Sequence, residues 1–331
     1  SCGARLPVYA LFAAAFFPGS GQNIVFALYL LGIVAAIFTG LFLKHTLYPG
    51  SSDTLVMEMP DYELPTLQNV VIKTWQKLKR FVLGAGKTIV IVVAILSFFN
   101  SLGTDGSFGN EDSENSVLSK AAQVVTPVFA PIGVQEDNWP ATVGIITGIF
   151  AKEAVVGTLN SLYTTPSDGE EAEFDLMGSL EEAVMSIPDN LAGLSYSDPL
   201  GIEVGDLTDS SAVAEEQEVD ASIFGNIKAQ FASGNAAFAY LIFILLYTPC
   251  VAAMGAYVRE FGHNFARFIA VWTMGLAYLC ATFYNQLTHF ADSPITSGIW
   301  MAVIVAIFFG TYRVFKRVGK KHQGALEVQV A

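Results

Sequence analysis

Long apolar runs are the feature that most constrains how this chain can fold. Five runs are near-continuous: Ile24–Leu43, Thr88–Phe99, Ala236–Tyr257, Phe265–Phe283 and Ile299–Tyr312. A helix of about 20 apolar residues spans a bilayer, and it satisfies every backbone polar group within itself. Charged residues form 14% of the chain, against about 25% in soluble domains. The sequence therefore predicts an all-α polytopic membrane protein.

The acidic residues are concentrated in one hydrophilic insertion, residues 165–232. The net charge of −13 arises mainly there, because Asp168–Asp220 holds 16 acidic residues and no Lys or Arg occurs between Glu153 and Lys228. Most of this segment is expected to be a solvated loop. Nucleic acid binding would need a basic surface, so that class of function is excluded.

A basic amphipathic segment, residues 65–82, precedes the second long apolar run. Its apolar residues share one helical face, and its basic residues share another: Leu67, Val71, Trp75, Leu78 and Val82 against Lys73, Lys77 and Arg80. Such a helix is typical of the membrane surface, and contact with membrane lipids is expected.

The sequence GAGKT at Gly84–Thr88 suggests a nucleotide-binding loop but does not fit one. The Walker pattern requires glycine where Phe81 stands, and no strand precedes it. We expect a helix that continues through this segment, with Lys87 reaching toward the lipid head groups.

The distribution of basic residues predicts which loops share a side of the membrane. The basic tail Arg313–Lys321 predicts a cytoplasmic C-terminus. Counting back along the spans puts the acidic insertion, residues 165–232, outside. The basic cluster Lys73–Arg80 independently puts loop 100–140 outside. Both flanks of the apolar run Ala141–Tyr163 are therefore expected on the same, periplasmic side.

A helix that crosses once cannot have both ends on one side. Either Ala141–Tyr163 is a re-entrant pair of half-helices that breaks near Ala151–Glu153, or residues 117–134 add another crossing. We favour the pair, with about six membrane-spanning helices beside it. The break would hold Lys152 and Glu153, and charges near a bilayer centre are by default functional candidates. A simple ion pair that holds helices together is the alternative.

A second polar segment interrupts an apolar run at Tyr247–Cys250. Pro249 cannot donate a backbone hydrogen bond, so it is expected to leave the carbonyl of Leu245 free. That carbonyl, the Cys250 thiol and the Met254 thioether would suit a transition metal such as Fe(II). An inert cysteine beside a packing kink is the alternative.

Two further cysteines and an asparagine bear on the same path. Cys2 precedes a helix-breaking proline, as Cys250 follows one, whereas Cys280 lies in an ordinary span and is expected to be core. Asn160 lies two helical turns beyond Glu153 and is a candidate to line the same route.

Three separate motifs, SCGARLPVYALF, GIFAKEAVVGTLNSLY and LLYTPCVAAMGAYVREFG, resemble the membrane part of the ferrous iron transport protein B (FeoB) family. The resemblance implies two gate repeats similar to nucleoside-transporter gates. Residues 1–20 would end the first repeat. Residues 83–164 and 233–260 would form the second. A span with its connector (21–64) and the C-terminal spans (261–331) would complete the chain.

The resemblance implies Fe(II) import through the bacterial inner membrane, with Cys2, Glu153 and Cys250 along the path. GTP and Mg would belong to a G domain ahead of these repeats, so we expect no enzymatic activity from this fragment. That G domain, the small proteins FeoA and FeoC, and a further copy of the protein are the implied partners. We hypothesise a low-affinity relay in which Lys152 neutralises the empty site. The alternative function is a permease for nucleosides or another small solute.

Overall fold

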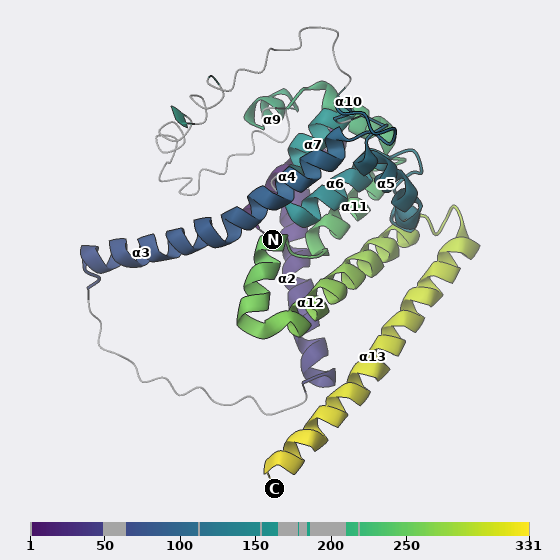
Figure 1. Cartoon of the computed structure of the whole chain (residues 1–331). Coiled ribbons are helices and arrows are strands. Elements are labelled where there is room, and N and C mark those ends of the chain that lie inside the picture. The colour runs from purple at the N-terminus through teal and green to yellow at the C-terminus, as the bar shows by residue number, and fades with distance from the viewer. Residues whose placement is uncertain are drawn as a thin grey trace.

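The structure is a computed structural model that describes residues 2–48, 64–111, 113–152, 154–164, 178, 184–185, 210–217 and 219–330. These residues form helices and no strand (Figure 1). In chain order the elements are η1 (Gly3–Arg5), α1 (Leu6–Phe16), α2 (Gly21–Thr46), α3 (Leu67–Phe81), η2 (Val82–Gly86), α4 (Lys87–Ser101), α5 (Val117–Val125), η3 (Thr126–Ile132), α6 (Trp139–Phe150), α7 (Ala154–Tyr163), α9 (Ser210–Glu216), α10 (Ser222–Gln230), α11 (Gly234–Leu246), α12 (Val251–Thr288) and α13 (Pro294–Val330).

Four helical stretches in the described residues are long and apolar enough to cross a membrane: Gly21–Thr46, Leu67–Ser101, Gly234–Thr288 and Pro294–Lys320. The third stretch folds back on itself, because α12 bends sharply at Gly262, which adopts a positive φ of 84°. The Thr248 hydroxyl donates to the carbonyl of Ala270, 3.1 Å away, across this bend. The predicted all-α polytopic membrane fold is confirmed.

The apolar run Ala141–Tyr163 forms a helical hairpin. Its first helix, α6, ends at Phe150, and Ala151 is extended, with φ −141° and ψ 103°. At the open end, the Tyr163 hydroxyl donates to Oδ1 of Asn138, 2.5 Å away. Asn138 caps the start of α6, so the end of α7 lies beside the start of α6. The predicted pair of half-helices with a break after Ala151 is confirmed.

Residues 117–134, the segment of the alternative extra crossing, form α5 and η3. Val117 donates its N–H to the carbonyl of Leu102. The carbonyl of Pro131 accepts from Asn285, and Val134 pairs with Phe231 beside the start of α11.

The shorter apolar helices form the interior, and the long ones surround it. Every residue from Val8 to Ala15 in α1 is buried, and α11 is buried almost throughout. The Phe12 ring stacks on Tyr240 with centroids 5.2 Å apart. In contrast, α2 exposes large apolar side chains such as Phe26. A helix buried on all sides belongs to a core, whereas an exposed apolar surface suits contact with lipid.

The amphipathic helix α3 leads into α4 through a π-helical turn, η2, and projects from the bundle (Figure 1). Gly84 and Gly86 lie within this helical turn. The predicted continuous helix through GAGKT is confirmed, so the phosphate-binding loop is absent from these described residues. Lys87 is exposed at the start of α4, and Trp75 is exposed on α3.

The hairpin topology makes a labelling prediction. Ser107, in the loop after α4, and Ser210, at the start of α9, are both exposed. Single cysteines at these positions, in a background without other cysteines, should react with a membrane-impermeant maleimide from the same side of the membrane. Reaction of the two positions from opposite sides would contradict a hairpin whose ends share one face.

Candidate functional site

Three segments that are distant in the sequence meet in the interior. They are the start of α1 with Cys2 and Arg5, the tip of the α6–α7 hairpin with Lys152, and the break between α11 and α12. Arg5 contacts the carbonyls of Leu245 and Tyr247, and Lys152 contacts the carbonyl of Thr248. The three motifs that the sequence analysis singled out therefore converge on one junction.

The break after α11 follows from Pro249. Because proline has no N–H, the carbonyl of Leu245 lacks its usual helical donor. Nη1 of Arg5 donates to this carbonyl instead, and Nη2 donates to the carbonyl of Tyr247, 3.4 Å away. The predicted loss of the helical partner of Leu245 is thus compensated by a side chain from α1. Arg5 had not been singled out from the sequence, although a guanidinium in an apolar segment beside Pro7 is an available signal.

Lys152 lies almost completely inside the molecule, with only 3% of its surface exposed. Its Nζ atom donates to the carbonyl of Thr248, 3.0 Å away, and lies 4.1 Å from the ring centroid of Tyr247. The Arg5 guanidinium carbon lies 5.6 Å from the same ring centroid. Tyr247 therefore contacts two cations at the C-terminal end of α11, where the helix dipole favours positive charge.

The predicted metal-binding side chains surround this junction in part. Cys250 is half-buried at the N-cap of α12, and Cys2 is exposed before η1. Both cysteines lie in the neighbourhood of the Lys152 ammonium. Met254 lies one turn beyond Cys250 and is half-buried. Glu153 lies outside the described residues. Among the residues that are described, no group of three or more His, Cys, Asp or Glu is arranged to hold a metal ion.

Asn160 lies at the opposite end of α7 from the hairpin tip. Its Oδ1 accepts from the backbone N–H of Asp220, 3.1 Å away, and from the hydroxyl of Thr164, 3.2 Å away. These bonds connect α7 to the segment that leads into α10. The structure therefore places Asn160 away from Lys152, beside the open end of the hairpin.

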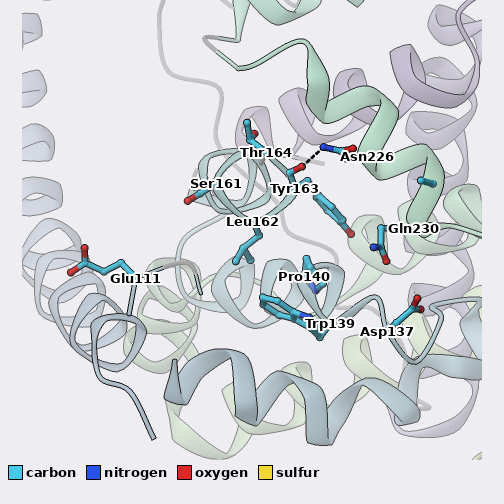
Figure 2. A pocket seen from close by; sticks show the side chains of 11 residues that line it. Glu111, Asp137, Trp139, Pro140, Ser161, Leu162, Tyr163, Thr164, Asn226 and Gln230 are labelled. Carbon is cyan, nitrogen blue, oxygen red and sulfur yellow. Dashed lines mark hydrogen bonds between the residues drawn. The ribbon is translucent and has the colours of Figure 1, made fainter. Parts of the chain in front are cut away.

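A cavity of about 620 Å³ lies at that open end. Figure 2 shows its lining, in which Asp137 and Trp139 come from the start of α6, Tyr163 from the end of α7, and Asn226 and Gln230 from α10. The carboxyl group of Glu111 lies across the cavity, and Asn226 donates to the carbonyl of Tyr163, 2.5 Å away. Segments that are distant in sequence build this cavity, so no local motif predicts it.

Glycines allow the hairpin to approach its neighbours closely. A Cβ atom on Gly148 would collide with the hydroxyl of Tyr247 and would lie 2.7 Å from Cγ2 of Val155. One turn earlier, a Cβ atom on Gly144 would lie 2.9 Å from Leu159. The position of Tyr247, and with it the cation contacts, depends on the absence of a side chain at Gly148.

These features define the class of protein. A re-entrant helical hairpin that meets the ends of broken helices inside an apolar bundle is typical of membrane transport domains. Comparison with known proteins narrows the class further.

The family model described as "Nucleoside recognition", named Gate, matches residues 82–264. The model described as "Ferrous iron transport protein B C terminus" matches residues 25–77. The proteins named Fe(2+) transporter FeoB from Salmonella typhimurium and Escherichia coli (strain K12) are each 42% identical to this chain over 313 residues. The one from Shigella flexneri is 41% identical.

In each case the match covers 92% of this chain and 39% of the relative, so the chain spans about two fifths of the length of these relatives. No solved structure matches the chain. The chain belongs to the ferrous iron transport protein B family, and its similarity lies in the C-terminal membrane part of that family.

The close approach at Gly148 predicts that alanine lowers the stability of the protein at this position but not at Gly157. Gly148→Ala should lower stability by about 1–3 kcal/mol, because Tyr247 or Val155 must move to admit the methyl group. Gly157→Ala on α7 is the matched control, since nothing lies within 4 Å of its added Cβ. Thermal unfolding in detergent, followed by size-exclusion chromatography, measures both. Equal stability of the two variants would contradict the close contact.

Proposed function

We propose that this chain is the permease part of a bacterial Fe(II) uptake transporter of the inner membrane. The observation that carries the proposal is the junction at which Cys250 begins α12 directly after a helix break and Lys152 donates to the carbonyl of Thr248. Membership of the ferrous iron transport protein B family supports the same substrate.

The chemistry of the junction suits a metal of intermediate softness. Thiolate and thioether ligands favour soft ions, whereas carbonyl and carboxylate oxygens favour hard ones, and Fe(II) can use both. Cys250 and Met254 supply sulfur, and Thr248 supplies a carbonyl beside them. We propose that Glu153, which follows Lys152 in the sequence, adds a carboxylate to a transient relay with Cys250 and Cys2. A transported ion needs such weak, sequential sites because it must also leave them.

The direction of transport follows from the charge pattern. The basic end of α13 should lie in the cytoplasm, and the opposite side, with the cavity at the open end of the hairpin, should face the periplasm. Glu111 and Asp137 line that cavity, so it could collect hydrated cations before they reach the junction. The acidic insertion, residues 165–232, would belong to the same side and add to the negative potential there.

The energy source lies in the rest of the full-length protein. We propose that a cytoplasmic G domain, which binds GTP and Mg, controls this permease, and that the permease itself catalyses no reaction. FeoA, FeoC and a further copy of the protein are proposed partners on the basis of the family alone.

A second candidate is a permease for nucleosides, which the description of the Gate model suggests. Nucleoside binding relies on aromatic stacking and on amide donors around the break. The described junction instead presents Arg5, Lys152 and Tyr247 beside two cysteines. Uptake of labelled nucleosides that is insensitive to Fe(II) would favour this second candidate.

Substitution of the proposed path residues tests the Fe(II) assignment. In the full-length protein, Cys250→Ser and Glu153→Gln should each reduce Fe(II) uptake to about one tenth or less, because each removes one proposed ligand of the relay. Uptake of ⁵⁵Fe(II) under reducing conditions, normalised to the amount of membrane-inserted protein, measures the effect. Cys280→Ser is the matched control in a span. Full uptake by both path variants would overturn the relay.

A further inference from the structure

The C-terminal end of α11 holds three carbonyls close together in sequence that accept hydrogen bonds from cationic side chains: Leu245, Tyr247 and Thr248. The carbonyl end of a helix attracts positive charge. In transporters with broken helices, unwound carbonyls coordinate the transported cation. The structure therefore shows a cation site in which the cations belong to the protein itself.

The two cations hold this end of the helix in different ways. Arg5 donates to two carbonyls with one planar guanidinium, which is always charged and gives a rigid contact. Lys152 donates to the carbonyl of Thr248 alone and also lies against the ring of Tyr247. Its ammonium is a compact charge on a flexible stem, next to the extended residue Ala151. Of the two cations, Lys152 has the fewer carbonyl hydrogen bonds to break.

We propose that Lys152 is a tethered cation that occupies a divalent-metal site formed by the Thr248 carbonyl and the Cys250 thiol beside Tyr247. A metal ion binds there only as the ammonium leaves. This inference rests on the proposed Fe(II) path and adds a control element to it. The ammonium keeps the empty site from attracting other cations, and it lowers the affinity for the metal so that the ion is released.

A purely structural role for Lys152 makes the opposite prediction. If the ammonium only caps α11, its loss destabilises the junction and leaves metal binding unchanged or weaker. If it competes with the metal, its loss tightens metal binding, because a positive charge next to the site is removed. The sign of the change in affinity separates the two roles.

The experiment uses the purified full-length protein and Co²⁺ as the probe, with binding followed by thiolate-to-metal absorption and by calorimetry. Lys152→Met keeps the apolar stem and removes the charge. It should lower the Kd for Co²⁺ by at least about tenfold and reduce Fe(II) uptake, because the ion is released more slowly. Lys87→Met is the matched control, since Lys87 is an exposed lysine at the start of α4, and it should change neither quantity.

A second variant covers the case in which Lys152→Met does not fold. Lys152→Gln retains a hydrogen-bond donor for the Thr248 carbonyl but lacks the charge, so it should also bind Co²⁺ more tightly. An unchanged or higher Kd in either folded variant overturns the tethered-cation role. Failure of the unaltered full-length protein to take up Fe(II) would instead overturn the proposed function, so the two failures are distinguishable.

Discussion

The carbonyl end of α11 is the constraint on which the interior depends. A buried carbonyl without a donor costs free energy comparable to a lost hydrogen bond. Arg5 and Lys152 supply donors from two other segments of the chain. The break in one helix therefore fixes where α1 starts and where the α6–α7 hairpin turns. A proline at residue 249 has consequences across the whole junction.

Hydrogen bonds hold the α6–α7 hairpin at both its tip and its open end. At its tip, Lys152 is bonded to the carbonyl of Thr248. At its open end, Asn138 accepts from Tyr163 and donates to the carbonyl of Gln230. Between the two ends, the glycines of α6 allow contact with Leu159 and Tyr247 without intervening side chains. The hairpin is therefore a short, closely packed element that joins the cavity end to the junction.

Sequence patterns predicted the parts of this arrangement that depend on local composition. Apolar runs predicted the helices, charge parity predicted the hairpin, and Pro249 predicted that the carbonyl of Leu245 lacks a helical donor. The donors to the carbonyls could not be predicted in the same way, because Arg5 lies 240 residues from its acceptor and no periodicity relates the two. The ring of Tyr247 as a shared contact was missed for the same reason. The role of Glu153 stays a prediction, since it lies outside the described residues.

Positive side chains beside a proposed cation pathway weaken binding of the cation. This weakening opposes transport only if the pathway must bind the cation tightly. A path lined with several carboxylates and thiolates would hold a divalent ion so firmly that transport would be limited by its release. Buried positive charge offsets part of that attraction, and carbonyls rather than carboxylates provide a modest field in an environment of low dielectric constant. On the proposed path, the junction would combine ligands that accept Fe(II) with positive charges that oppose its binding. The backbone break would then keep binding weak, and the cysteines would need only to select the metal.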